Sequence, residues 1–190
     1  SQIYYDKDLG FLALFTHYIV QSLPSGRKAC RVAAYMRSTD GTHWSEWRDL
    51  ANIQQGHYQN STQRGQKVAT AFNYHPDRKQ GAGLDYRTNL YYLQTDDFGK
   101  SWTTVSGAPA KLPLTTIDNE ALVHDYASEG LKVYINDVNF DGKGNPVILY
   151  ETTKGWEPGP ENGPRQWYTA HWTGSNWSII PVTTSDNNYD

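Results

Sequence analysis

A turn motif that recurs along the chain constrains its fold more than any other feature. Residues 95–102 read TDDFGKSW, which has the form Ser/Thr-x-Asp-x-Gly-x-x-Trp, and residues 38–44 read STDGTHW, the same form with one residue fewer. The aspartate accepts hydrogen bonds from backbone N–H groups of a tight turn, and the glycine takes a backbone conformation that other residues resist. The tryptophan packs back over the strands that the turn joins. A degraded third copy, without the aspartate, covers residues 172–177. These turns predict a chain built from β-hairpins.

Runs of β-branched and aromatic residues flank the turns and predict strands. They cover residues 11–21, 29–36, 67–74, 89–94, 130–135, 146–151, 166–172 and 177–183, with short return strands at 44–49 and 102–105. No helical periodicity of useful length is present. The units recur about every 45–60 residues, which is the period of propeller blades. We predict an all-β fold, a β-propeller of four-stranded antiparallel blades. A two-sheet sandwich is the alternative, but it does not require the same turn at the same place in successive units.

The length sets how much of a propeller the chain can hold. At ~45–50 residues per blade, the 190 residues cover about four blades. An open propeller would expose the edges of its sheets. We therefore expect residues 1–190 to be part of a single β-propeller domain and to pair with the rest of the propeller chain in a longer protein.

Composition narrows the class of partner. The chain has seven Trp and fourteen Tyr, a profile that suits carbohydrate binding, and its net charge of −3 offers no basic face to nucleic acid. Cys30 is the single cysteine, so no internal disulfide can form. The sequence shows no signal-peptide pattern, and the apolar run at 11–15 is far shorter than the ~20 residues needed to cross a membrane. We expect neither nucleic acid nor membrane as a partner.

The turn motif resembles the Asp-box of sialidase-like β-propellers, and longer strings narrow the resemblance. These are GHYQ at 56–59, AFNYHP at 71–76, RTNLYYL at 87–93, YINDV at 134–138, FDGKGNP at 140–146 and NYD at 188–190. With them the chain resembles a BNR-repeat family of secreted polysaccharide-degrading enzymes. That family includes seven-bladed ulvan lyases and lyases or rhamnosidases that act on rhamnosyl-glucuronate linkages. The resemblance implies a secreted or periplasmic propeller, seven-bladed in the family, with a polysaccharide or oligosaccharide as substrate.

The resemblance favours a polysaccharide lyase that cleaves a rhamnose- and uronate-containing glycan by β-elimination. A glycoside hydrolase on the same fold, rhamnosidase-like or sialidase-like, is the alternative, as is a non-catalytic glycan-binding propeller. Sialidases bring three arginines to one carboxylate and use a Tyr–Glu pair, and the N-terminal Arg-Ile-Pro motif of that family is absent from this sequence. Release of an unsaturated product separates the lyase from the binding protein.

Two histidines are the leading catalytic candidates. His57 follows Gly56 and His75 precedes Pro76, so both lie where a strand begins or ends. Histidine titrates near neutral pH and can serve as a base or help to neutralise a uronate carboxylate. The paired histidines of the family fall on these two positions. We expect both rings to line one cleft, and we expect alanine at either position to lower turnover with little change in melting temperature. The alternative is that each histidine caps a strand and bonds to the backbone.

Arginines and tyrosines would complete the site. Arg87 and Arg165 are the candidates to bind the uronate carboxylate, because the planar guanidinium matches its geometry. Tyr134 is the candidate catalytic acid or base, with Tyr126 and Gln59 as further substrate-binding residues, Gln59 through the string it shares with His57. The sequence contains no HxH or HExxH spacing for a catalytic zinc, and we predict no catalytic metal. Oxygen ligands at Asp125, Asn136 and Asp137 would suit a structural Ca²⁺.

Overall fold

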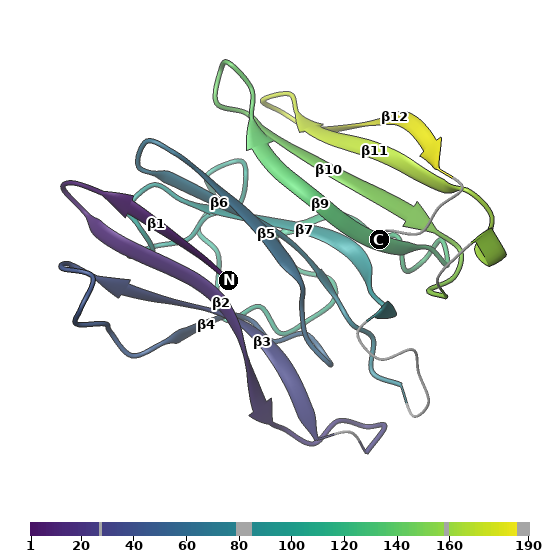
Figure 1. Ribbon diagram of the computed structural model, residues 1–190, viewed down its shortest axis with the longest axis horizontal. Helices are drawn as coiled ribbons and strands as arrows, with labels where there is room; N and C mark the ends of the chain where they lie inside the picture. Colours follow the sequence, from purple (N-terminus) through teal and green to yellow (C-terminus); the bar gives the residue numbers. More distant parts are fainter. Residues whose placement is uncertain (27, 79–84, 158–159, 186–190) are drawn as a thin grey trace.

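The structure is a computed structural model that describes residues 1–26, 28–78, 85–157 and 160–185. It contains three antiparallel sheets of four consecutive strands each (Figure 1). Sheet 1 contains β1 (Gln2–Asp6), β2 (Gly10–Val20), β3 (Ala29–Ser38) and β4 (Arg48–Ala51). Sheet 2 contains β5 (Gln59–Arg64), β6 (Lys67–Tyr74), β7 (Thr88–Thr95) and β8 (Leu122–His124). Sheet 3 contains β9 (Lys132–Phe140), β10 (Pro146–Thr153), β11 (Arg165–Trp172) and β12 (Trp177–Ser185). Sheets of four sequential strands set side by side are the blades of a β-propeller, which confirms the predicted fold.

The described residues hold three blades, where the repeat length predicted about four. Successive blades begin at Gln2, Gln59 and Lys132, farther apart than the assumed repeat, and sheet 2 is the longest because β7 and β8 are separated by residues 96–121. This connection forms no further strand pair of the sheet. It packs onto the sheets instead, because Leu114 and Ala121 are buried in the core between sheets 1 and 2. The predicted short strand at 102–105 is only an isolated bridge between Thr103 and Gln94.

The first strands of sheets 1 and 2 have no apolar alternation and were not predicted. The β5 strand reads QNSTQR, and its side chains bond across to neighbouring sheets instead of entering an apolar core. Asn60 Nδ2 donates to Ile135 O of β9 at 2.9 Å, and Gln63 Nε2 donates to Tyr5 O of β1 at 2.9 Å. Hydrogen bonds of this kind, from side-chain amides to backbone carbonyl groups, hold the first strands of the three sheets beside one another. The polar side chains of β5 are therefore satisfied by the backbone of neighbouring strands.

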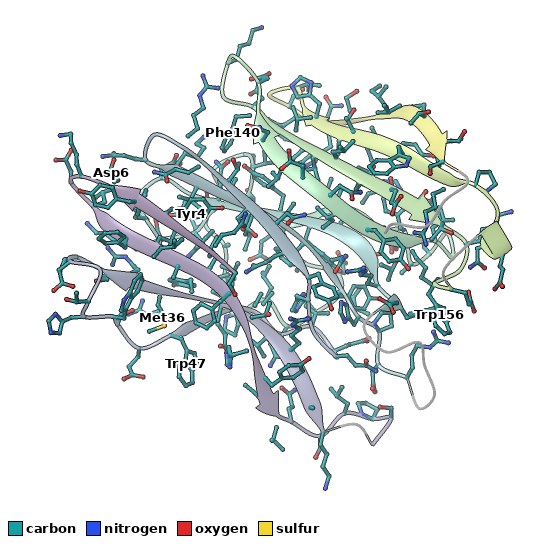
Figure 2. The ribbon with its side chains drawn as sticks, viewed as in Figure 1. Tyr4, Asp6, Met36, Trp47, Phe140 and Trp156 are labelled. Atoms are coloured by element: carbon teal, nitrogen blue, oxygen red, sulfur yellow. The ribbon has the colours of Figure 1, made fainter. Side chains whose placement is uncertain are left out.

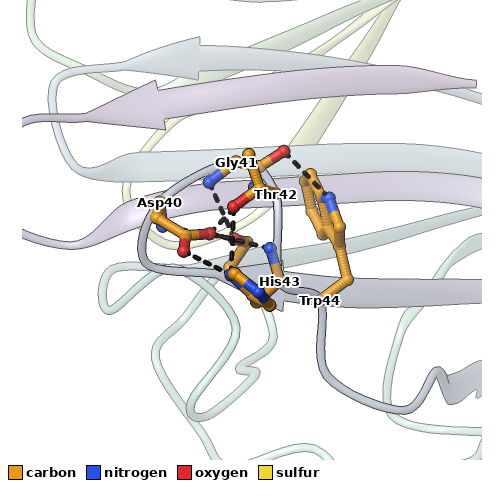
Figure 3. A network of polar contacts seen from close by, with 6 residues as sticks. Asp40, Gly41, Thr42, His43 and Trp44 are labelled. Atoms are coloured by element: carbon orange, nitrogen blue, oxygen red, sulfur yellow. Dashed lines mark hydrogen bonds and ion pairs between the residues drawn. The ribbon is translucent and has the colours of Figure 1, made fainter.

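The repeated turn motif joins the third and fourth strands of each sheet. In the first copy Asp40 Oδ1 accepts hydrogen bonds from the backbone N–H groups of Thr42 and His43, both at 2.8 Å, and Trp44 Nε1 donates to Gly41 O at 3.2 Å (Figure 3). In the second copy Asp97 Oδ1 accepts from Ser101 N at 2.9 Å, while Thr95 Oγ1 accepts from Gly99 N at 2.8 Å. The two motifs begin at the last residues of β3 and β7, so they occupy the same place in successive sheets.

The same motif also joins one sheet to the next. Trp102 of the second copy packs edge-on against Tyr35 of sheet 1, with ring centroids 5.4 Å apart and planes at 62°. Trp177, which ends the degraded third copy, packs edge-on against Tyr92 of sheet 2, at 5.4 Å and 66°. Tyr35 and Tyr92 both lie three residues before the hydroxyl residue that opens the motif. The turn therefore provides a repeating contact between successive sheets as well as a hairpin.

Two apolar cores lie between the sheets. Sheets 1 and 2 enclose the first, which includes Leu12, Leu14, Phe72, Tyr91 and Trp102, and Tyr4 of β1 packs against it (Figure 2). Sheets 2 and 3 enclose the second, which includes Leu90, Tyr92, Val133, Ile148 and Tyr150. Within the described ranges, no helix is long and apolar enough to span a membrane. The cores fix the sheets face to face and leave the strand ends to form a site.

Candidate functional site

The segment around Gly56 brings parts of two sheets together. Arg31 N donates to Gln55 O at 2.8 Å, His57 N donates to Arg31 O at 3.0 Å, and His75 N donates to Gly56 O at 2.9 Å. Gly56 has a φ of 136°, and a Cβ atom there would lie 2.3 Å from Arg31 O. Only glycine fits this close approach. The result is that the beginning of β3, the end of β6 and the residues before β5 meet at one end of sheets 1 and 2.

His57 is built into this junction by both of its ring nitrogens. Its side chain is fully buried, Nε2 accepts the backbone N–H of Ile53 at 2.9 Å, and Nδ1 lies 2.8 Å from Asn73 O, to which it donates. Burial lowers the pKa of His57 to about 4, although the bond to Asn73 acts in the opposite direction. The imidazole is therefore neutral at pH 7. Its two hydrogen bonds match the alternative given above, in which the histidine caps a strand by bonding to the backbone.

His75 is equally buried but makes no such bonds. Among the described residues neither ring nitrogen has a hydrogen-bond partner. Its ring lies against that of Tyr58, with centroids 5.1 Å apart. Burial, with the nearby His57, Arg87 and Arg31, holds the pKa of His75 well below its usual value of 6.5. The two histidines do lie close together, as expected, but both are covered and neither lines a cleft.

A small polar pocket opens beside Tyr58, the residue whose ring lies against His75. Its volume is about 140 Å³, and it is lined by Tyr58, Gln59, Asn60, Arg87 and Ile135. Arg87 precedes β7, Gln59 begins β5, and Ile135 belongs to β9, so the pocket lies where strand ends of sheets 2 and 3 meet. Two of the predicted residues, Arg87 and Gln59, are in this pocket. No carboxylate lines it within the described residues.

Guanidinium groups and tyrosine rings alternate in a stack that includes Tyr58 and Arg87 of the pocket and continues behind it. Tyr58 lies between Arg31 and Arg87, whose Cζ atoms are 4.6 Å and 4.5 Å from its ring centroid. Tyr134 lies between Arg87 and Arg165, at 4.4 Å and 4.6 Å. Such stacking holds a cation over an aromatic face and is stronger when water is excluded. The stack fixes the direction of Arg87, the guanidinium that reaches the pocket.

Tyr134 and Arg165 support the pocket from behind. Both are buried, and the Tyr134 hydroxyl donates to Asp85 O at 2.8 Å. Arg165 Nη1 lies 3.4 Å from Glu151 Oε1, a fully buried carboxylate that is the register partner of Tyr134. Burial raises the pKa of Tyr134, against the opposing effect of Arg87 and Arg165. Burial likewise raises the pKa of Glu151. Neither Tyr134 nor Arg165 lines the pocket.

The structure places Tyr126 elsewhere. It belongs to the core between sheets 2 and 3, and its hydroxyl lies 2.6 Å from that of Tyr150. Tyr58, Asn60 and Arg31 were not predicted as site residues. A signal for Tyr58 was present, because it directly follows His57 in the string GHYQ. Arg31 has no local signal, since it reaches the site only through the contact of β3 with Gly56.

The described residues bring no three His, Cys, Asp or Glu side chains together as a metal site. Asp125 Oδ1 accepts from Ser128 N at 3.3 Å, and Asp137 Oδ1 accepts from the backbone of Val138 at 2.9 Å. A structural Ca²⁺ at these residues stays a prediction.

Fold and pocket together define a β-propeller with a cationic, tyrosine-rich site at one end of its sheets. The chain belongs to the BNR repeat-containing family, whose model matches residues 15–185. A comparison with curated proteins finds no match.

Three solved structures share the fold. A PL25 ulvan lyase superposes with a TM-score of 0.66 at 17% identity, over 90% of this chain and 44% of that one. The same kind of lyase bound to -[GlcA(1-4)Rha3S]- gives a TM-score of 0.65 at 17% identity and the same coverage. The polysaccharide lyase Uly1 gives 0.59 at 11% identity, over 90% and 38% of the two chains. The chain thus spans less than half the length of these lyases, and at such identities the likeness concerns the fold.

Proposed function

We propose that the chain is part of a polysaccharide lyase that cleaves a uronate-containing, anionic polysaccharide by β-elimination. The observation that carries the proposal is the pocket itself, in which Arg87 and Tyr58 stand side by side with the amides of Gln59 and Asn60. A guanidinium suits a uronate carboxylate, and amides suit sugar hydroxyl groups. The likeness in fold to ulvan lyases, one of them bound to a glucuronate–sulfated rhamnose chain, supports the same substrate class.

In the proposed reaction Arg87 binds the carboxylate and makes the proton on C5 easier to remove. A base takes that proton, the C4–O bond breaks, a C4=C5 double bond forms, and the departing oxygen receives a proton. Negative charge develops on the carboxylate side of the sugar, where Arg87 and, behind it, Arg31 and Arg165 stabilise it. Tyr58 is the tyrosine whose ring lines the pocket, so we assign the proton transfers to Tyr58 in place of Tyr134.

The buried residues have supporting roles in this proposal. His75 stays neutral and packs under Tyr58, and we assign it the positioning of that ring. Tyr134 and Arg165 hold Arg87 in place, and His57 holds the junction between the sheets. The site would need no metal for these steps, because the guanidinium supplies the positive charge.

A glycoside hydrolase is the competing function, and one observation favours it. Tyr134 and Glu151 lie side by side close to two arginines, which are the residue types of a sialidase site. Glu151 is fully buried and paired with Arg165, however, and hydrolases generally use two carboxylates that reach the substrate. This arrangement supports elimination over hydrolysis.

The test is turnover of a glucuronate–rhamnose polysaccharide by the full-length protein, followed by absorbance of the unsaturated product. We expect Tyr58→Phe to lower kcat by about 10²–10⁴ with little change in KM, because the ring and its stacking remain while the hydroxyl is lost. We expect Arg87→Lys to lower kcat/KM by about 10²-fold or more. Arg48→Lys, at the exposed first residue of β4 and outside the site, is the matched control. New reducing ends without the unsaturated product would show hydrolysis and overturn the proposal, as would wild-type rates in Tyr58→Phe.

A further inference from the structure

The alternating arginines and tyrosines beside the pocket have one more member, on sheet 1. Arg31 Cζ, which lies 4.6 Å from the ring centroid of Tyr58, also lies 5.8 Å from that of Tyr18. Tyr18 belongs to β2 and is the register partner of Arg31. Contacts therefore run from Tyr18 through Arg31 and Tyr58 to Arg87, which lines the pocket. The proposed elimination gives Tyr18 no role.

The register of β2 places Tyr18 on the face of sheet 1 that meets sheet 2. Leu12 and Leu14 of the same strand are buried in the core between these sheets, and Tyr18 lies on their side of the strand because the side-chain period is two. β1 pairs with β2 only as far as Leu14, so the end of β2 extends past β1 (Figure 1). Tyr18 thus lies beyond the core, at the end of the sheets where Arg31 meets Gly56.

The ring of Tyr18 is open to solvent although it is held from one side. The residue is 61% exposed, while Arg31 lies over its ring. Arg31 is fixed in turn, because its Nε donates to Thr16 Oγ1 at 2.9 Å. The ring therefore offers solvent the side that faces away from Arg31. An aromatic surface held in one direction loses little conformational entropy when a ligand packs on it.

The guanidinium of Arg31 has hydrogen-bonding capacity that the protein leaves unused. In the described part of the chain its two Nη atoms have no hydrogen-bond partner, and both keep contact with solvent. A guanidinium donates paired N–H groups to oxyanions such as a carboxylate or a sulfate ester. The apolar side of a sugar ring packs on an aromatic face. Tyr18 and Arg31 together therefore match a sugar residue that carries an anionic group.

The spacing of the rings fits residues of one polysaccharide chain. Because both ring centroids lie close to the same guanidinium carbon, Tyr18 and Tyr58 are separated by no more than about the length of a disaccharide. Tyr58 and Arg87 line the pocket that binds the uronate in the proposed reaction. A chain bound there can therefore extend over Tyr18.

We propose that Tyr18, with Arg31 behind its ring, is a second sugar-binding subsite, which holds an anionic sugar residue outside the two residues that flank the cleaved bond. The identity of the polysaccharide rests on the proposed function above. Binding of the sugar does not, because it can be measured without turnover.

The experiment is calorimetry with a disaccharide and a tetrasaccharide of glucuronate and rhamnose 3-sulfate, in the Tyr58→Phe background so that neither is cleaved. We expect the tetrasaccharide to bind more tightly, because it alone reaches Tyr18. Tyr18→Ala should weaken tetrasaccharide binding about tenfold, the effect of covering one face of an aromatic ring, and leave disaccharide binding unchanged. Tyr18→Phe should keep the affinity of the parent protein, because it keeps the ring. The melting temperature should not change in either variant, since the residue is largely exposed.

Two modified pairs of oligosaccharides identify the anionic group. In one pair the sulfate is removed, and in the other the uronate carboxylates are reduced to alcohols. A tighter binding of the tetrasaccharide that disappears in the first pair assigns a sulfate to the subsite, and one that disappears in the second assigns a carboxylate. Tighter binding that survives unchanged in both pairs would overturn the anionic part of the proposal.

Tyr5→Ala is the matched control. Tyr5 is 56% exposed and pairs with Phe11, at the opposite end of β2 from Tyr18. Its replacement should leave binding of both oligosaccharides unchanged. In turnover by the otherwise wild-type protein, Tyr18→Ala should raise KM for the polysaccharide with kcat unchanged, because a remote subsite binds substrate and transition state equally.

The outcomes separate this inference from the proposed function. Tetrasaccharide binding that Tyr18→Ala weakens, without any unsaturated product from the polysaccharide, would support the subsite and overturn the lyase. Unsaturated product with unchanged tetrasaccharide affinity and KM in Tyr18→Ala would support the lyase and overturn the subsite. An equal loss of disaccharide binding in Tyr18→Ala would also overturn it, since Tyr18 would then contact the sugars that flank the cleaved bond.

Discussion

Both ring nitrogens of His57 are engaged by backbone groups, so any proton that the ring gains must break a buried hydrogen bond. The pKa of about 4 in the folded protein lies below the usual 6.5, chiefly because of burial. A group whose folded pKa is lowered contributes stability above its unfolded pKa and loses that contribution as the pH falls toward the folded value. For His57 this window runs from about pH 6.5 down to about pH 4.

We therefore predict that the free energy of unfolding falls by about 3 kcal/mol between pH 7 and pH 4 through His57 alone. His75, whose pKa is also lowered, adds to the fall. His57→Gln should be less stable than the wild type at pH 7 by about 1–3 kcal/mol, because buried backbone groups lose a partner. Its stability should also fall less on acidification. Urea unfolding at several pH values measures both, and an identical pH dependence in the variant would refute the assignment.

The candidate site could be predicted in part, and the limit is physical. Arg87 and Gln59 stand next to recognisable strand ends, and both line the pocket. Whether the nitrogens of His57 face substrate or backbone depends on Ile53 and Asn73, which meet only after the sheets have packed. Sequence position alone cannot distinguish these two cases. Tyr126 has the right residue type for the site, but its hydroxyl is already bonded to Tyr150 in a core.

At the scale of elements, the tryptophans of the two turn motifs pack against different sheets. Trp102 is 3% exposed and packs on Tyr35 of the neighbouring sheet, and Gly99 of the same turn lies against Leu12 and Tyr35. Trp44 is only partly buried and contacts Phe11 of its own sheet, with ring centroids 6.3 Å apart.

The chain thus contains its own matched pair of substitutions. We expect Trp102→Ala to lower the free energy of unfolding by about 3–5 kcal/mol, the cost of emptying a packed aromatic site. Trp44→Ala should cost about 1 kcal/mol, because less of its surface is buried. Urea unfolding of the two variants checks the difference. Equal losses would mean that the turn acts only as a hairpin and not as a contact between sheets.

The strands that the sequence predicts are those with apolar faces. The β9 and β10 strands, for example, pair across residues 141–145, a turn rich in glycine and asparagine. The polar strand β5 could not be predicted by periodicity. Its stability comes from Asn60, Gln63 and similar side chains that bond to strands of other sheets, and such bonds have no signature in the local sequence.

Over the whole molecule, the charge distribution matters more than the net charge. The chain carries −3 overall, yet five cations gather around three tyrosine rings at one end of the sheets. They are Arg31, Arg78, Arg87, Lys132 and Arg165, stacked on Tyr58, Tyr86 and Tyr134. Under the proposed function, such a concentrated positive field in an otherwise acidic protein would attract an anionic polymer to the site and away from the rest of the surface.

This field predicts a salt dependence of the reaction. Between about 0.05 M and about 0.5 M salt the screening length falls severalfold, and we expect kcat/KM for an anionic polysaccharide to fall about tenfold. Arg78→Gln should reduce this dependence, because Arg78 stacks on Tyr86 without lining the pocket at Arg87. Arg48→Gln, which removes a charge of the same sign at the exposed first residue of β4, should not reduce it. The measurement is initial rates of unsaturated product across the salt series, with urea unfolding in parallel to exclude loss of folded protein. Equal salt dependence in the wild type and Arg78→Gln would show that this cation does not contribute to attraction of the substrate.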